Sequence, residues 1–460
     1  MRAHSGRALR LLLIASALAS GAPPAAAEPL AAALARTYRG NPQLSAERAR
    51  QRVDDENVPR ALSGYRPTIA GQATYGPTYA RARPGSGDDV ASPLNLSINL
   101  QQMLYDSGRT SATVRSAESG VFGGRATLRG TEQTVLLLAA TAYMNVLRDE
   151  QVISLQLGNI EALTETLRIA RKRFETGDSR RTDMAQAEAR LARGQADLAV
   201  ARNNLMASQA TYRQVIGAEP RDLTFPPPPT GLLARSLAAA TSSARREHPA
   251  IRAALHAVDG AEHDVKVAEA DLGPQLLAQG NAQTDIGRSL SGDVATPAPT
   301  YSLGLQATVP VYDGGLAAAR VRQAKENVGQ RRMDLETARV GVVADLRTAW
   351  GVLDAARAAV PAAETAIAAN EIAVAGVRAE ALEGQRTTLE VLNAQQELLN
   401  AKTSLVVARR DLVVASYGVL STTGGLTARR LGLRGQHYRP ETHYDQVRDL
   451  KATLRTPDGR

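Results

Sequence analysis

The chain has 460 residues, with 55 Lys and Arg against 46 Asp and Glu, no cysteine and an aromatic content of 3%. A sequence without cysteine excludes disulfide scaffolds, Cys-ligated zinc, iron–sulfur clusters, thiol catalysis and lipid attachment through an N-terminal cysteine. Because few aromatic rings are present to fill a core, alanine and leucine have to supply the packing, which favours long and closely spaced helices.

The first 27 residues have the pattern of a secretory signal peptide. Three arginines precede an apolar run over Leu11–Leu18, and Ala25–Ala27 form a small-residue cleavage site, so we expect the mature chain to begin at Glu28. A membrane anchor is disfavoured because the run is far shorter than the ~20 residues that span a bilayer. Loss of the three arginines lowers the net charge from +9 to +6, which gives poor support for nucleic-acid binding.

The sequence repeats itself at a constant spacing of 207 residues. The matching pairs are Asn41-Pro42 with His248-Pro249, Pro67 with Pro274, Tyr105-Asp106 with Tyr312-Asp313, Gly177 with Gly384, Ala201-Arg202 with Ala408-Arg409, and Gly217 with Gly424. An unbroken register over ~180 residues favours two halves of one pseudo-symmetric object over two independent domains.

Each copy contains two segments in which apolar and polar residues alternate. The expected strands cover about 67–79 and 93–104 in the first copy, and about 274–286 and 300–311 in the second. Their length and alternation suit either a half-buried soluble sheet or tilted strands that cross a bilayer. In a membrane sheet, one set of side chains would line water (Asn95, Asn99, Gln101, Asn281, Gln306) and another would face lipid (Leu96, Ile98, Leu303, Leu305).

Each strand pair is followed by a long segment with helical periodicity. A helix from about residue 107 to 176 would be roughly 105 Å long, a length that suits a coiled coil. We expect antiparallel helical hairpins over about 107–217 and 315–424, with tips near 177–183 and 384–390. Pro361 should bend the second long helix, or break it.

These segments divide the chain into a duplicated architecture that is mostly α-helical with transmembrane β-strands. The expected parts are a signal peptide (1–27), a first repeat (28–220), a linker (221–233), a second repeat (234–427) and a flexible tail (428–460). Four strands cannot close a barrel, and eight would leave an interior filled by side chains, so an open lumen needs three chains and twelve strands.

The duplicated chain resembles the TolC family of outer-membrane channel proteins over about residues 29–431. The resemblance rests on Asn41-Pro42, the run Arg173-Phe174-Glu175-Thr176-Gly177 at the first tip, the run from Ala201 to Leu205, and Tyr312-Asp313-Gly314-Gly315. It implies a homotrimer whose twelve-stranded β-barrel lies in outer-membrane lipid and continues as a periplasmic α-helical barrel. It also implies a periplasmic adaptor and an inner-membrane transporter as partners.

The resemblance further assigns roles to the hairpin tips. It implies a periplasmic entrance closed by Glu390 and by Arg386, with Thr182 and Asp183 as the partners of that arginine. The sequence departs from the family pattern at Ala381, where a tyrosine is expected, and at Asn393, where a second acidic residue is expected. The closing network should therefore be thinner; alternatively, these residues are solvated tip charges.

The same tips are where an adaptor should dock. The residues that this assigns are Gly177, Asp178, Ser179, Arg180, Arg181, Gly384, Gln385 and Thr387.

No pattern in the sequence indicates an enzyme, a cofactor or a metal site. His256 and His263 are seven residues apart, but two histidines are too few ligands for a metal centre. The sequence therefore predicts a passive export channel of a tripartite type I secretion or multidrug efflux system. The alternative is a soluble periplasmic coiled-coil scaffold or adaptor. A protein or drug substrate is favoured over a metal ion because no His- or Met-rich tract occurs.

Overall fold

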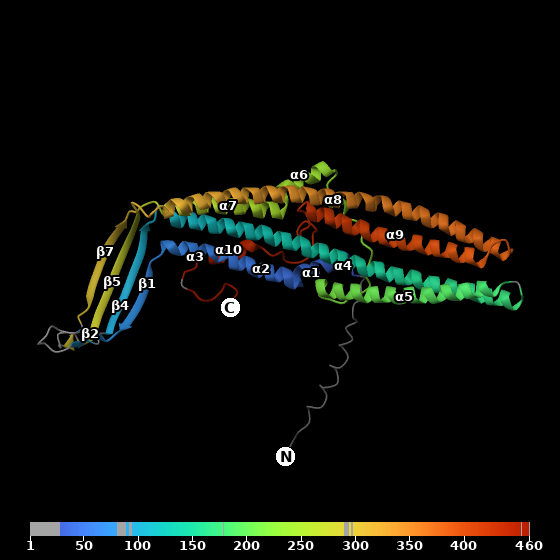
Figure 1. Ribbon diagram of the computed structural model, residues 1–460, viewed down its shortest axis with the longest axis horizontal. Coiled ribbons are helices and arrows are strands. Elements are labelled where there is room, and N and C mark those ends of the chain that lie inside the picture. Colours follow the sequence, from blue (N-terminus) through green and yellow to red (C-terminus); the bar gives the residue numbers. More distant parts are fainter. Residues whose placement is uncertain are drawn as a thin grey trace, which may run out of the picture. The chain divides into compact units, whose positions relative to one another are not determined.

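The computed structural model describes residues 28–80, 89–91, 94–177, 179–288, 294–295, 298–451 and 453–459 (Figure 1). The predicted signal peptide and Asp178 lie outside the described residues. The chain divides into two compact units. The first contains residues up to Gly40, Leu137–Thr230 and Leu353–Ser416, and the second contains Asn41–Leu136, Gly231–Val352 and the rest of the chain from Tyr417.

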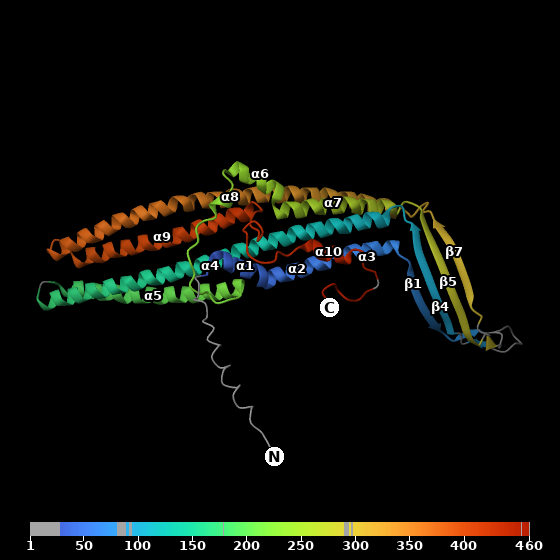
Figure 2. The same cartoon turned by 180° about the vertical axis from the view of Figure 1, so that it is seen from behind.

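An antiparallel sheet in the second unit holds the predicted strands in the order β1-β4-β5-β7 (Figures 1 and 2). The strands are β1 (Thr68–Tyr75), β4 (Leu94–Tyr105), β5 (Gln275–Arg288) and β7 (Thr300–Thr308), with the short β2 (Thr78–Ala80), β3 (Asp89–Ala91) and β6 (Val294–Ala295) beside them. β7 ends before the expected residue 311, because Pro310 has no N–H to donate to a ladder.

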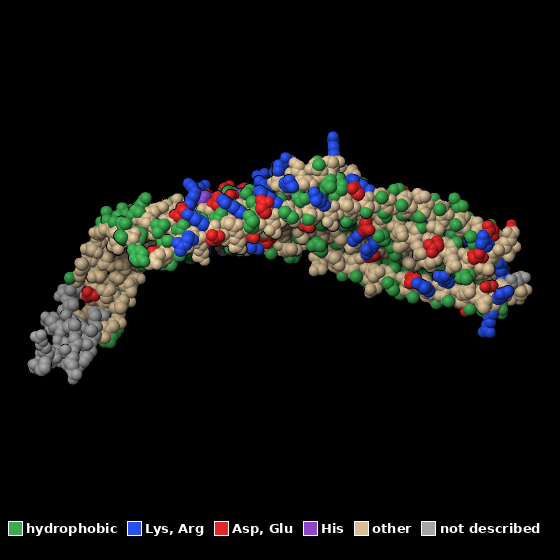
Figure 3. Space-filling view, turned by 45° about the horizontal axis from the view of Figure 1, so that its top comes forward, with side chains coloured by type: hydrophobic (Ala, Val, Ile, Leu, Met, Phe, Trp, Pro, Cys, Tyr) green, Lys and Arg blue, Asp and Glu red, His purple; other side chains and the backbone are tan. Residues whose placement is uncertain are grey.

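The register of the sheet separates an apolar face from a polar face. Ile69 lies opposite Leu100, which lies opposite Gly280, and Leu303 follows on β7. On the other face, the side-chain amide of Asn281 donates to Asn99 at 2.8 Å. The apolar side chains are bare, with Leu303 85% exposed. Figure 3 shows charged side chains gathered over the helices and little charge on the described part of the sheet.

Two long helices follow the strand pairs, as the periodicity predicts. α4 (Arg109–Glu175) and α8 (Leu316–Leu382) each have 67 residues, and their return helices are α5 (Arg181–Ile216) and α9 (Thr388–Thr422). At about 1.5 Å per residue, each long helix extends about 100 Å. Pro361 lies inside α8, which continues through it, so the helix is not broken there.

In the first hairpin, apolar residues of α4 recur at a spacing of three or four residues. Leu163, Leu167 and Ala170 of α4 lie in one buried cluster with Ala187 of α5. Phe174, which continues the same spacing, is instead 42% exposed, because it lies in the last turn before the tip. The hairpin core therefore ends one turn before the loop.

Shorter helices precede the strands of each repeat. They are α1 (Leu30–Gly40), α2 (Pro42–Asp55), α3 (Asn57–Leu62) and the 3₁₀ turn η1 (Ser63–Tyr65), then the 3₁₀ turn η2 (Thr230–Leu232), α6 (Leu237–Glu247) and α7 (Pro249–Ala270). Asn41 begins α2, and its side chain accepts hydrogen bonds from the amides of Gln43 and Leu44, at 2.9 and 3.2 Å. His248 begins α7 in the same way, with Pro249 as the first helical residue. The repeated Asn/His-Pro pair is thus a helix start.

The C-terminal segment differs from the expected flexible tail. It contains α10 (Pro440–Val447), which contacts α2, and Val447 is fully buried. The ring Nδ1 of His443 lies 3.0 Å from the carboxylate of Asp55, whose side chain is completely buried. The structure corrects the expectation over these residues. Eight residues are too short for a periodic apolar pattern to be recognised in the sequence.

Among the described residues, no helix combines the length and the apolar character needed to cross a membrane.

Candidate functional site

The tip of the first hairpin is built from a glycine and a helix cap. Gly177 has φ of 80°, a left-handed conformation that favours glycine, and its amide donates to the carbonyl of Phe174 at 3.1 Å. Arg180 then begins α5, and its amide lies 3.4 Å from the carboxylate of Asp183. Arg181 and Thr182 are exposed, and Ser179 is half-buried.

The tip of the second hairpin is likewise built from a glycine and a helix cap. Gly384, also at φ of 80°, donates to the carbonyl of Ala381 at 3.2 Å, and Gln385 donates to the carbonyl of Glu380 at 2.9 Å. These two bonds form the Schellman arrangement that terminates helices. Thr387 and Glu390 then form a capping box at the start of α9. The amide of Thr387 donates to the carboxylate of Glu390 at 2.8 Å, and the amide of Glu390 donates to the hydroxyl of Thr387 at 3.3 Å.

Arg386 joins two carboxylates at this second tip. Its guanidinium donates to Glu380 at 2.7 Å and to Glu390 at 2.8 Å. The backbone and side chain of Thr387, together with Arg386, lower the pKa of Glu390 to about 2. The two carboxylates raise the pKa of Arg386. The cluster consequently carries two negative charges and one positive charge.

The predicted partnership of Arg386 with Thr182 and Asp183 is not seen within one chain. Among the described residues, Arg386 forms its ion pairs within its own hairpin, and Asp183 caps its own helix. A single chain does not test a contact between neighbouring copies, so the gating role of these residues stays a prediction.

Arg173 makes a contact that sequence reasoning missed. Its guanidinium, in the last turn of α4, donates to the main-chain carbonyls of Ala381 at 3.0 Å and Leu382 at 3.3 Å, at the end of α8. The carbonyls at a helix C-terminus carry partial negative charge, so they suit a cation. No side-chain pattern could have revealed the contact, because its acceptors are backbone atoms.

Two further polar contacts join the hairpins. Arg190 of α5 donates to the side-chain oxygen of Asn393 at 2.8 Å, and Gln395 of α9 donates to the hydroxyl of Thr166 at 3.4 Å. Asn393, expected to weaken the network because it is neutral, is thus an acceptor for an arginine of the other hairpin.

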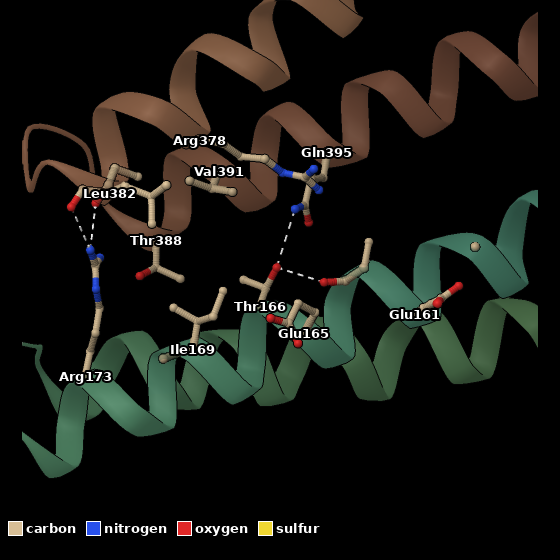
Figure 4. Close-up of a pocket in the computed structure, with 14 residues that line it drawn as sticks. Glu161, Glu165, Thr166, Ile169, Arg173, Arg378, Leu382, Thr388, Val391 and Gln395 are labelled. Carbon is tan, nitrogen blue, oxygen red and sulfur yellow. Dashed lines mark hydrogen bonds between the residues drawn. The ribbon is translucent and has the colours of Figure 1, made fainter.

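A groove of about 540 Å³ lies between the two hairpins near these contacts (Figure 4). Its walls come from α4 on one side and from α8 and α9 on the other, with Arg173 at one end and the Thr166–Gln395 contact across it. Ile169, Leu382 and Val391 supply apolar surface. Among the described residues, no group of three or more His, Asp or Glu side chains is placed to hold a metal ion.

The chain belongs to the outer membrane efflux protein family. The model of that family matches residues 33–218 and again residues 240–425, so the second match begins 207 residues after the first, as the internal repeat predicts. The chain is therefore an outer-membrane efflux channel, and the predicted family, function class and location are confirmed. The alternative of a soluble scaffold or adaptor is set aside.

Individual relatives agree with this assignment. The outer membrane efflux protein BepC of Brucella suis is 40% identical over 467 residues, which cover all of both chains. The outer membrane protein TolC of Vibrio cholerae is 27% identical over 76% of this chain and 80% of its own. The crystal structure of the Campylobacter jejuni CmeC outer membrane channel has the same fold, with a TM-score of 0.76, 17% identity and coverage of 93% and 90% of the two chains.

Proposed function

We propose that three copies of this chain form a passive export channel, with a twelve-stranded barrel in the outer membrane and a helical barrel in the periplasm. The observation that carries the proposal is the sheet, whose outer strands β1 and β7 have partners on one side only in the described chain. Such edges present unpaired N–H and C=O groups. Pairing β7 of one copy with β1 of the next satisfies both edges and closes the barrel.

The side chains of the sheet support the same assembly. The apolar face carries Ile98, Leu303 and Leu305, which are 56%, 85% and 69% exposed in a single chain. Apolar side chains that are this exposed in a single chain are suited to contact with lipid. The opposite face carries amides such as Asn99 and Asn281, which suit a water-filled lumen.

The hairpin tips form the gated entrance in this proposal. Three copies bring three clusters of Arg386, Glu380 and Glu390 around one axis. Contacts that exist only in the closed state set the equilibrium between closed and open tips. Within each chain, the bonds of Arg173 to the end of α8 supply such a contact. They replace the contact that the family's tyrosine would make at position 381, where this chain has alanine.

A periplasmic adaptor and an inner-membrane transporter supply the energy and open the tips. We assign adaptor docking to the predicted tip residues around Gly177 and Gly384, where the described backbone turns and most of the described side chains are exposed. The protein itself performs no catalysis in this proposal, as befits a family named for efflux.

The exported substrate is a protein or a drug rather than a metal ion. Deletion of the gene, followed by assays of secreted protein, drug resistance and metal tolerance, tests this preference. We expect loss of secretion or of resistance; a defect confined to metal tolerance would contradict it.

Reconstitution tests the channel itself. Protein extracted from outer membranes in detergent should be trimeric and should conduct ions in planar bilayers.

A further inference from the structure

Glu28, the residue at which the mature chain is expected to begin, is held by its backbone in the first unit. Its amide nitrogen donates to the carbonyl of Asp222 at 3.1 Å, and its carbonyl oxygen lies 2.6 Å from the hydroxyl of Tyr143. An isolated parallel bridge also pairs Glu28 with Leu223. One extended residue is thus fixed on both sides immediately after the predicted cleavage site.

Two buried tyrosines and a loop hold Glu28. Tyr143 of α4 is fully buried, and its hydroxyl also accepts from the amide of Thr224 at 3.0 Å. Tyr212 of α5, equally buried, donates to the Glu28 carboxylate at 3.3 Å. Asp222 has φ of 42°, an unusual conformation for a residue with a side chain, which the surrounding contacts maintain. Two helices and a strained loop therefore form one cradle.

The charges around the cradle are unbalanced. The cradle has three carboxylates, those of Glu28, Glu150 and Asp222, and one guanidinium, that of Arg36, which lies 3.3 Å from the Glu28 carboxylate. The Glu28 side chain is only 10% exposed, and its oxygen Oε1 is the atom that pairs with Arg36. Burial, and then the negative charge of Asp222, raise the pKa of Glu150. One further positive charge would suit this environment.

We propose that this cradle is a binding site for the free α-ammonium group of Glu28, which cleavage after Ala27 creates. Hydrolysis breaks the Ala27–Glu28 amide bond: the oxygen of water goes to the new Ala27 carboxylate and both of its protons go to the Glu28 nitrogen, which becomes an ammonium group. The neutral amide of the precursor has one N–H, which Asp222 accepts. The ammonium group has three N–H bonds and a positive charge, so it can donate to the same carbonyl and also to the carboxylates of the cradle.

Processing and folding are coupled through this site. Only the cleaved chain can place a cation there, so cleavage stabilises the first unit. The titratable groups of the cradle include Arg36 of α1, Tyr143 and Glu150 of α4, Tyr212 of α5, Asp222 and the side chain of Glu28 itself. Burial raises the pKa of both tyrosines, whose hydroxyls consequently remain neutral near pH 7. The charge balance there is set by the carboxylates, the guanidinium and the new ammonium group.

The bound ammonium should have a raised pKa. An ordinary α-amino group has a pKa of about 7.7 to 8.0. Because its folded pKa is raised, its stabilising effect is complete below that ordinary value and is lost as the pH rises through the folded pKa. Stability should therefore fall as the pH rises above about 8 in the processed protein.

Amine labelling of the processed, outer-membrane protein tests the proposal. Mass spectrometry should find Glu28 as the first residue, and an amine-acylating reagent near pH 7 should modify its nitrogen about tenfold more slowly in the folded than in the urea-unfolded chain, because a bound ammonium group is not nucleophilic. Glu150→Gln combined with Asp222→Asn should restore several-fold faster labelling. Asp197→Asn, an exposed carboxylate of the same unit, is the matched control and should change nothing. A different first residue, or equal rates in the folded and unfolded chains, would overturn the proposal.

A one-residue extension provides a second measurement. A serine inserted between Ala27 and Glu28 moves the ammonium group about 3.5 Å along the chain while leaving Glu28 in place. This variant should unfold at a lower temperature at pH 7 and should lose the decrease in stability above pH 8. An unchanged melting profile would contradict the site. If the extended chain does not assemble, the labelling rates of the wild-type protein still decide the question.

Discussion

The guanidinium of Arg173 donates a hydrogen bond to the main-chain carbonyl of Ala381 at 3.0 Å, and so joins the end of α4 to the end of α8. The first hairpin thereby holds the second through backbone atoms rather than through a second side chain. The acceptor at residue 381 is a backbone atom, so the side chain there need not be a hydrogen-bond partner. Ala381 is buried, and its small side chain leaves room for the arginine beside it.

Arg173→Met should raise the resting conductance of the channel. Methionine keeps much of the apolar stem but removes the charged hydrogen bonds, each worth about 1.5 to 3 kcal/mol. Single-channel recording measures the effect. Arg171→Met is the control, because Arg171 pairs with Glu188 inside its own hairpin, at 2.7 Å. Equal resting conductance in both variants would show that Arg173 does not hold the tips together.

Leu305→Arg should reduce insertion into the outer membrane, whereas Gln306→Arg should not. The two residues are neighbours on β7, so their side chains lie on opposite faces of the sheet. A cation on the lipid face costs about 2 to 4 kcal/mol at mid-depth, but one on the lumen face mainly alters ion selectivity. Heat-modifiable migration on gels and reversal potentials in bilayers distinguish the two outcomes. Similar insertion of both variants would contradict the assigned faces.

Block of the channel by trivalent cations from the periplasmic side should not change between pH 5 and pH 8. The pKa of Glu390 is lowered to about 2, so its carboxylate stays ionised over this range. Any stability that it adds is present above its ordinary pKa and is lost only as the pH falls toward 2. Glu390→Gln should weaken the block, while Glu397→Gln, an exposed neighbour on α9, should not. A block that titrates near pH 5 would place the constriction at another group.

Arg386→Ser combined with Asp183→Ala should raise resting conductance and sensitise cells to bulky antibiotics without loss of the trimer. Removal of Arg386 leaves Glu380 and Glu390 without their shared cation, so like charges repel at the tip. Removal of Asp183 takes away the cap of α5 and the predicted partner in a neighbouring copy. Wild-type conductance and sensitivity would refute the gating role.

The elements that depend on local pattern could be predicted from the sequence, and those that depend on backbone atoms could not. Alternation located the strands, and the long segments without proline located α4 and α5 to within a few residues. The bonds of Arg173 were missed because carbonyl oxygens have no signature in a sequence. The docking of α10 was missed because it depends on side chains that only the fold brings together, such as His443 against Asp55 and the buried Val447.

The partners of Arg386 illustrate a different limit of prediction from sequence. The family resemblance implied Thr182 and Asp183 as its partners, but within one chain its guanidinium pairs with Glu380 and Glu390 of its own hairpin. Spacing along the sequence cannot rank partners that a turn brings together.

The assembly of three four-stranded sheets into one channel is tested most directly by joint measurement of mass and conductance on one preparation. Protein extracted from outer membranes should have the mass of three chains and should give discrete conductance steps after insertion into a planar bilayer. The trimer should also dissociate, and the steps should disappear, when β7 is prevented from pairing, as by Leu303→Pro. A stable monomer, or a trimer that never conducts, would contradict the account.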